Sequence, residues 1–282
     1  MGIQPLKKMV SLLLAGAFFF AIFSFPQKSV KARAGEDNPY GWDFLAAYTT
    51  YYSEKDVGRC ENIAIAATLI DGITLQAYGE FSFNQTVGRR TQEAGFQQAK
   101  IIVNGEYVLG VGGGVCQVST TLYNAALLAG LTVTEFHPHS LKVGYVPPSR
   151  DAMVSSGSDL KIINTRAEPV YLSAQTFQGG VRVAFYGKNT GDRYEITSVV
   201  TGKILPPAPI VKEGDEACVL REEKAGVCSE AYLERYFGKR LVQRKRLRLD
   251  EYRPIQGIIV KKVVNPTNKM RSNDCVFCEK ML

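Results

Sequence analysis

The feature that most constrains the fold is a run of glycines that leads into a helix with a cysteine at its start. The run spans Gly110 to Gly114, with valine at position 111, and Val115 and Cys116 follow it. Residues 117–129 carry apolar side chains at helical spacing and stop at Gly130, which predicts a helix. Glycines permit positive φ and a close approach to the backbone. We therefore expect a tight turn that fixes the start of a central helix.

Short apolar segments separated by turns surround this helix. Residues 63–70 predict a second helix, and the aromatic, alanine-rich segment 42–52 predicts another. Asn104-Gly105 between two apolar runs predicts a β-hairpin. The pattern favours an α+β fold, in which a largely antiparallel, short-stranded sheet packs against a few helices, one of them starting at the glycine-rich motif. Further strands are expected at 73–78, 131–136, 160–164, 170–176 and 181–186.

The N-terminus has the three parts of an export signal. Lys7 and Lys8 precede an uncharged apolar run at 10–25, and residues 32–34 have the small-x-small pattern of a cleavage site. The run is shorter than the roughly 20 residues that span a bilayer. We expect residues 1–34 to be a cleaved signal peptide, with a retained membrane anchor as the alternative. The chain is then exported, to the outer face of the membrane, the cell wall or the medium.

The positive charge is concentrated in that leader. Of the net charge of +7, five units lie in the first 35 residues, which contain no acid, so the rest of the chain carries +2. Nucleic acid is therefore not expected as a partner. The basic run at 244–248 is expected to be a solvated face, with contact to anionic wall polymers or the membrane surface as the alternative.

We expect a domain at 35–200, followed at 201–282 by a proline-rich linker and a charged, cysteine-bearing C-terminal region. In an oxidising compartment, two local disulfides are the plain interpretation of its four cysteines. A four-cysteine zinc site is the alternative. The two expected pairs are Cys218 with Cys228 and Cys275 with Cys278.

Cys116 lies where the start of a helix stabilises a thiolate. The first turn of a helix has N–H groups without intrahelical partners and carries partial positive charge. Such a position can lower a thiol pKa from about 8.5 to roughly 3.5–7.5. The N–H groups of Gly113, Gly114 and Gln117 are candidates to bind the oxyanion of a tetrahedral intermediate. The motif lacks the Gly-Lys-Ser/Thr ending and the third glycine that phosphate binding requires.

The only two histidines, His137 and His139, follow the strand after this helix. Pro138 keeps the segment extended, so both rings project to the same side and one of them can reach the thiol. We predict thiol acyl transfer with His139, or alternatively His137, as base and then acid, oriented by Asp151 or Ser140. A metal site at the two histidines is less favoured, and no cofactor is expected.

Basic residues near this pair predict an anionic substrate. Arg150 is expected to bind a substrate carboxylate, with Arg89 or Arg90 as a second cation. The alternative for the cysteine is structural. Cys116 would then be a small buried side chain or form a disulfide with Cys60.

Three motifs in this region closely resemble the VanW family. They are Phe81-Ser82-Phe83-Asn84 with the following Val87-Gly88 and Arg90-Thr91, the stretch from Gly112 to Ala126, and His137-Pro138-His139-Ser140 with Tyr145-Val146-Pro147 and Arg150-Asp151-Ala152. The resemblance covers about Arg59 to Tyr186. The family takes its name from glycopeptide-resistance gene clusters, and some members are reported as L,D-transpeptidases that use the cysteine of the glycine-rich motif.

The resemblance implies that peptidoglycan stem peptides are the substrate and that Cys116 forms an acyl-enzyme leading to 3–3 cross-links. Three alternatives remain open: a carboxypeptidase, a cysteine endopeptidase, and a non-catalytic envelope module that binds D-alanyl peptides or assists wall assembly. The motif residues expected to contact substrate are Arg150, Asn84, Arg90, Ser119, Ser140 and Tyr145.

Overall fold

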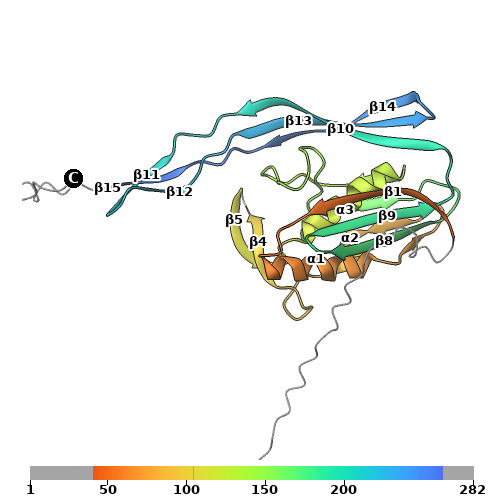
Figure 1. Cartoon of the computed structure of the whole chain (residues 1–282), viewed down its shortest axis with the longest axis horizontal. Coiled ribbons are helices and arrows are strands. Elements are labelled where there is room, and N and C mark those ends of the chain that lie inside the picture. The colour runs from red at the N-terminus through yellow and green to blue at the C-terminus, as the bar shows by residue number, and fades with distance from the viewer. Residues whose placement is uncertain (1–40, 104, 263–282) are drawn as a thin grey trace, which may run out of the picture. The chain divides into compact units, whose positions relative to one another are not determined.

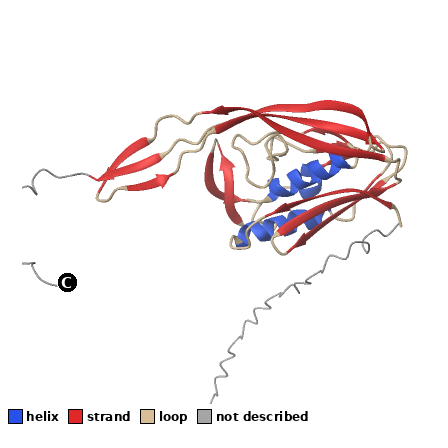
Figure 2. Cartoon of the chain, turned by 45° about the horizontal axis from the view of Figure 1, so that its top comes forward, coloured by secondary structure: helices blue, strands red, loops and turns tan. Residues whose placement is uncertain are grey.

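The computed structural model describes residues 41–103 and 105–262 (Figures 1 and 2). The leader and the pair Cys275 and Cys278 lie outside the described residues. The expected α+β class is confirmed, because helices pack against sheets that are mainly antiparallel. Among the described residues, no helix is long and apolar enough to cross a membrane. The helices are α1 (Val57–Ile70), α2 (Phe83–Val87) and α3 (Val115–Leu128).

The core lies between an antiparallel sheet, in the order β1-β9-β8-β2, and two helices. Helix α3 packs against β1 and β9, and α1 packs against β8 (Figure 1). Ile63 of α1, Leu122 of α3 and Phe185 of β9 are fully buried between them. The strands of this sheet are β1 (Asp43–Tyr51), β2 (Thr74–Leu75), β8 (Val170–Phe177) and β9 (Gly180–Gly187).

The helix expected at 42–52 is wrong, because this segment is strand β1. Its backbone pairs with β9 along almost its whole length. Its aromatic and β-branched residues suit a pleated surface better than a helix. Thr50, for example, is buried and shares a hydrogen bond of 2.8 Å with Thr121 of α3.

The two helices expected around 63–70 and 117–129 are confirmed. Asp56 caps α1 by accepting from the Arg59 backbone, so α1 begins earlier than the apolar pattern suggested. Gly114 caps α3 with φ of 106°. A Cβ at this position would lie 3.0 Å from Ile63, so both the conformation and the contact require glycine.

Two smaller sheets carry the loops around the start of α3. The expected hairpin is confirmed as β4 (Gln98–Val103) and β5 (Glu106–Val111). The other sheet has the order β3-β7-β6 and ends at the segment that contains the two histidines. Its strands are β3 (Glu80–Ser82), β6 (Thr132–Glu135) and β7 (Lys161–Ile163).

The region after residue 187 is built from long strands instead of a linker and tail. Strand β10 runs from Asp192 to Ile204, so the expected boundary at residue 200 falls inside a strand. Residues 205–209 connect β10 to β11. One sheet contains β10, β13 (Gly226–Phe237) and β14 (Arg240–Tyr252), and the other contains β11 (Ile210–Gly214), β12 (Cys218–Arg221) and β15 (Ile258–Lys262).

The expected disulfide between Cys218 and Cys228 is absent from the structure. Both thiols are free, because Cys218 lies in the sheet of β12 and Cys228 lies in the sheet of β13. In the basic run at 244–248 of β14, Arg244 and Arg246 are exposed and form ion pairs with β13, as expected for a solvated face, whereas Arg248 is buried, contrary to that expectation. Arg244 pairs with Glu234 at 3.2 Å, and Arg246 lies 3.7 Å from Glu230.

Candidate active site

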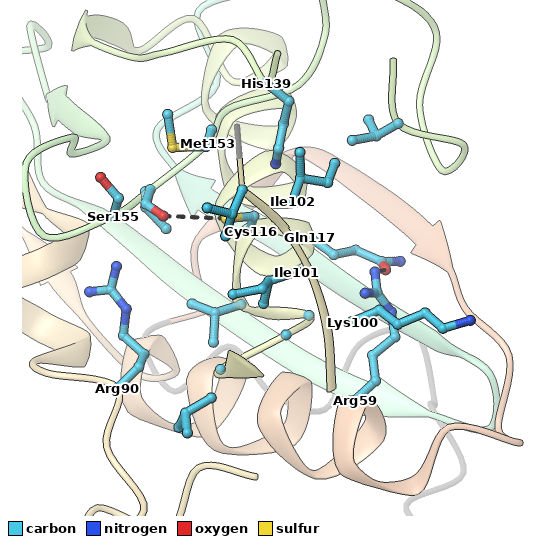
Figure 3. A pocket seen from close by; sticks show the side chains of 18 of the residues that line it. Arg59, Arg90, Lys100, Ile101, Ile102, Cys116, Gln117, His139, Met153 and Ser155 are labelled. Carbon is cyan, nitrogen blue, oxygen red and sulfur yellow. Dashed lines mark hydrogen bonds between the residues drawn. The ribbon is translucent and has the colours of Figure 1, made fainter. Parts of the chain in front are cut away.

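The glycine turn, the start of α3 and the β4–β5 hairpin surround a cleft of about 1050 Å³ (Figure 3). The half-buried Cys116 lies on its wall. Among the described residues that line the cleft, four carry positive charge and none is Asp or Glu. The cleft therefore suits an anionic ligand. The four cations are Arg59, Arg89, Arg90 and Lys100.

Cys116, His139 and Asp151 form a connected triad. His139 Nδ1 lies 2.7 Å from Asp151 Oδ2, and the same oxygen accepts from the backbone N–H of His139 at 2.7 Å. His139 also shares a side-chain hydrogen bond with Cys116, whose Sγ lies 3.4 Å from the carbonyl of Val154. In Figure 3 the His139 side chain points toward Cys116. His139 and Asp151 are both buried, so this geometry is shielded from water.

The electrostatics of the triad favour a thiolate beside an imidazolium. Burial raises the pKa of the Cys116 thiol, but the hydrogen bond and charge of His139 and the nearby Arg90 guanidinium lower that pKa below its ordinary value. Burial lowers the pKa of His139, but its hydrogen bonds with Asp151 and Cys116 raise that pKa to about 9. The lowered thiol pKa and the raised imidazole pKa both favour a pair that supplies a nucleophile and a proton donor.

The structure separates the alternatives for the base and its orienting group. His137 Nε2 lies 3.1 Å from Glu135 Oε1, and its half-exposed side chain does not line the cleft, so His137 is not positioned to act on Cys116. Asp151, and not Ser140, contacts the His139 ring. The Ser140 carbonyl instead accepts a hydrogen bond from Arg253 in the C-terminal region.

The expected oxyanion site needs one correction. The Gln117 N–H donates to the Gly114 carbonyl at 2.9 Å, so it is not free for a substrate oxygen. Val115 similarly donates to Gly112 at 3.1 Å. The remaining N–H groups of the first turn belong to Gly114 and Cys116, which makes these two the candidates for oxyanion binding.

Gly113 has a structural role in the same turn. Its carbonyl accepts from the Asn62 side chain at 2.9 Å, and a Cβ at residue 113 would lie 2.7 Å from Ala99 of β4. The absence of a side chain therefore lets the turn lie directly against the hairpin.

Two residues expected to contact substrate lie away from the cleft. Arg150 does not line the cleft, because its guanidinium donates to Asn124 at 2.8 Å and stacks 4.8 Å from the centre of the Tyr48 ring. Ser119 is fully buried, and its hydroxyl donates to the carbonyl of Ala152 at 2.6 Å. Both side chains hold α3 to its neighbours instead of facing a ligand.

Asn84, Arg90 and Tyr145 do line the cleft. Arg90 Nη1 donates to Asn84 Oδ1 at 2.8 Å, which fixes the guanidinium near the thiol. Asn84 is anchored in turn, because its amide donates to the carbonyl of Ser155 at 2.9 Å. This arrangement places one rigid cation beside the nucleophile.

Sequence reasoning missed three residues at this site. Arg59 lines the cleft and donates to Gln117 Oε1 at 2.6 Å, but the two are 58 positions apart, so no local pattern signals their contact. Arg248 and Tyr252 of β14 contact Asp151, and they lie in the region that was expected to be a charged tail. Arg248 ends the basic run that was expected to be solvated, but it is buried, and Tyr252 lies in no motif.

The structure also bears on the other options for the cysteines. Cys60 and Cys116 are both free, so they do not form a disulfide with each other. Cys60 Sγ lies 3.7 Å from the carbonyl of Ser53, outside the cleft. Within residues 41–103 and 105–262, no three His, Cys, Asp or Glu side chains are grouped so that they could hold a metal ion.

Comparison with known proteins gives a family for the segment that holds this site. The family model described as VanW like protein matches residues 58–186. The uncharacterized protein YoaR of Bacillus subtilis (strain 168) is 41% identical over 146 residues, which is 51% of this chain and 48% of that protein. The vancomycin B-type resistance protein VanW of Enterococcus faecalis (strain ATCC 700802 / V583) is 29% identical over 109 residues, 36% of this chain and 40% of that protein.

The chain therefore spans less than half the length of each of these two relatives. Among solved structures, that of HP0197-G5 is 16% identical and aligns over 25% of this chain and 96% of its own, with a TM-score of 0.15. That score is too low to indicate a shared fold.

Proposed function

We propose that this chain, whose residues 58–186 match the family model described as VanW like protein, is an exported cell-envelope enzyme, a cysteine-dependent L,D-transpeptidase that acts on peptidoglycan stem peptides. The observation that carries the proposal is the Cys116–His139–Asp151 triad at the edge of a cationic cleft. A relative described as a vancomycin resistance protein supports a role in wall metabolism.

In the acylation step, the Cys116 thiolate attacks the carbonyl carbon that precedes the terminal D-alanine. A C–S bond forms, and the N–H groups of Gly114 and Cys116 bind the oxyanion. The His139 imidazolium gives its proton to the departing amine as the C–N bond breaks. D-Alanine leaves, and a thioester remains on Cys116.

In the second step, the side-chain amine of diaminopimelate from another stem peptide attacks the thioester. His139, now neutral, takes a proton from that amine as the new amide bond forms and the C–S bond breaks. The products are a 3–3 cross-link and the original thiolate–imidazolium pair. If water replaces the amine, the same steps release a shortened peptide, which is carboxypeptidase activity.

The cations of the cleft support stem peptides as the ligand, because these peptides carry several carboxylates. Arg90 and Arg59 lie on opposite sides of Cys116 in Figure 3, and each is held by an amide side chain. Guanidinium groups bind carboxylates with two parallel hydrogen bonds. Arg59 and Arg90 are therefore the residues proposed to hold carboxylates on either side of the scissile bond.

A binding module without catalysis is the main alternative. A cationic cleft alone would be enough for that role. However, peptide binding does not require a buried imidazole whose pKa is raised to about 9 beside a thiol with a lowered pKa. Perturbed titratable groups that converge in a cleft are more typical of catalytic sites.

The deciding experiment is incubation of the purified chain with disaccharide tetrapeptide, followed by mass spectrometry of the muropeptides. We expect cross-linked dimers and one released D-alanine per dimer. Cys116→Ser should abolish both, whereas the matched variant Cys60→Ser should retain them because Cys60 is outside the cleft. Monomers shortened by one D-alanine would indicate a carboxypeptidase, and unchanged substrate at high enzyme concentration would contradict the proposal.

A further inference from the structure

We propose that the sheet of β13 and β14 is part of the active site and that Arg248 and Tyr252 are positioning residues for Asp151. The inference rests on the proposed function, since it assigns these residues to the same triad. Both lie outside residues 58–186, the segment that matches the family.

The contacts divide the Asp151 carboxylate between two partners. Oδ2 accepts from the side chain and the backbone N–H of His139. Oδ1 accepts from the Tyr252 hydroxyl and lies 3.5 Å from Nη2 of Arg248. Arg248 also donates to the backbone carbonyl of Asp151. The β14 side chains therefore fix the carboxylate so that its other oxygen faces the imidazole.

The turn before Asp151 is held by the same sheet. Ser149 is fully buried and has φ of 59°, a left-handed conformation that is unfavourable for a residue with a side chain. Its N–H donates to the Tyr252 hydroxyl at 2.7 Å, and its own hydroxyl lies 2.8 Å from that of Ser229 in β13. Strained conformations persist where the surroundings hold them in place, and they cluster at functional sites.

The segment of His139 is attached to the same strand end. The carbonyl of Ser140 accepts from the Arg253 backbone N–H at 2.8 Å, directly after β14. Hydrogen bonds to the C-terminal region are thus made by Ser140, one residue after His139, and by Ser149, two residues before Asp151. Loss of these contacts would change the relative position of the two side chains.

Arg248 does not need Asp151 in order to be neutralised. Its Nε already donates to the buried carboxylate of Asp250, and its guanidinium stacks 5.0 Å from the centre of the Phe136 ring. The additional contact places positive charge next to the triad. Burial raises the pKa of Asp151, but the hydrogen bond and charge of His139, and after them the Arg248 charge and the Tyr252 hydrogen bond, hold that pKa below its ordinary value. If Arg248 and Asp250 formed only a structural ion pair, the contact of Arg248 with Asp151 would not be required.

The sign of the expected pH effect follows from these contacts. Without Arg248 or Tyr252, Asp151 binds a proton at higher pH. A neutral Asp151 no longer stabilises the imidazolium, so the thiolate loses its partner at higher pH as well. The titratable groups that interact with Asp151 or with its β14 partners are His139 from the loop, Arg248, Asp250 and Tyr252 from β14, Tyr123 from α3, and Tyr145 from the cleft loop.

The test is the pH dependence of Cys116 alkylation by iodoacetamide in the full chain, followed by mass spectrometry of the peptide that contains Cys116. We expect the midpoint of the acid limb to rise by about half a pH unit or more in Tyr252→Phe and in Arg248→Gln. Arg248→Lys keeps the charge and should lie between wild type and Arg248→Gln. Arg246→Gln, on the same strand but exposed and paired with Glu230, should leave the midpoint unchanged.

An unchanged midpoint in folded Tyr252→Phe would overturn the inference, and this variant decides the question if Arg248→Gln does not fold. A shift of equal size in Arg246→Gln would also overturn it, because the effect would then be a general one of charge. Alkylation needs no peptidoglycan. If the variants shift the midpoint but the wild type forms no cross-links, the proposed function is rejected and the positioning role is retained. If the wild type forms cross-links but the variants do not shift the midpoint, the positioning role is rejected and the proposed function is retained.

Discussion

The Arg59 guanidinium donates to Oε1 of Gln117 at 2.6 Å and thereby joins the start of α1 to the start of α3. The Gln117 amide is fixed on its other side, because it donates to the Thr50 hydroxyl and to the Tyr51 carbonyl, each at 3.0 Å. The orientation of the cation is therefore set before a ligand arrives, which lowers the entropy lost on binding.

We predict that Arg59→Gln weakens substrate binding more than it slows the chemical step. Loss of one charge-assisted contact should raise KM for the tetrapeptide by about tenfold while kcat falls less. Steady-state release of D-alanine measures both constants. Arg150→Gln is the contrasting variant, because Arg150 contacts Asn124 and Tyr48 and does not line the cleft. A larger rise in KM for Arg150→Gln would contradict the site described above.

The pH dependence of kcat/KM should have two limbs, one from the titration of Cys116 and one from the titration of His139. The pKa of Cys116 is lowered, so activity appears as pH rises through that value and the thiolate forms. The pKa of His139 is raised to about 9, so the proton donor is present below this pH and is lost above it. The measurement is kcat/KM between pH 5 and about 10.

In His139→Gln, the pH midpoint of Cys116 alkylation should move toward the ordinary thiol pKa of about 8.5. Alkylation that is still rapid at pH 6 in this variant would contradict the pairing of Cys116 with His139.

Asp151→Asn should leave the fold largely intact but slow the reaction strongly. An amide cannot stabilise the imidazolium, and its NH₂ group favours the wrong tautomer of the ring. In a comparable triad the same change lowers kcat by about 10⁴-fold. Single-turnover D-alanine release measures the effect, with circular dichroism as the check on folding. A decrease of less than about tenfold would show that Asp151 does not orient the base.

Asn62→Ala is expected to destabilise the glycine turn. The buried Asn62 amide donates to the carbonyls of Gln97 and Gly113, each at 2.9 Å, and its carbonyl oxygen accepts from the Gln97 N–H at 2.7 Å. Loss of these hydrogen bonds should lower the free energy of unfolding by about 2–3 kcal/mol. Urea denaturation followed by fluorescence measures it, and a change below about 0.5 kcal/mol would mean that water replaces the side chain.

Ser119→Ala separates a structural role from substrate contact. Since the Ser119 hydroxyl donates to the Ala152 carbonyl in a fully buried position, the variant should lose about 1–2 kcal/mol of stability and keep the wild-type KM. Thermal unfolding and steady-state kinetics together distinguish the two. A raised KM with unchanged stability would restore the expectation from the sequence motif.

The parts of the fold that could be predicted from the sequence are those with local signals. The hairpin around Gly105 and the helix that ends before Gly130 depend on turn chemistry and spacing within a few residues. The segment 42–52 has alanine and aromatic residues that are compatible with a helix. Its strand conformation depends on pairing with β9, more than 120 residues later, which no local pattern reveals.

The same distinction applies to the site. Cys116 at a helix start and His139 at the end of an extended tripeptide could be predicted, because the motif fixes their local geometry. Arg150 was placed wrongly because residue type indicates which ligand a side chain can bind but not which way it points. Tyr252 was missed because its contact with Asp151 joins residues 101 positions apart in sequence.

Strand β10 begins a few residues after the family match ends at residue 186 and lies in the C-terminal sheet, and its Tyr194 ring covers Gly130 at the end of α3. A gene fusion that exchanged everything after residue 200 would cut this strand and discard Arg248 and Tyr252, the neighbours of the Asp151 carboxylate. If the proposed activity holds, the smallest transplantable segment should therefore extend at least to residue 253, and chimaeras joined earlier should bind peptides without processing them.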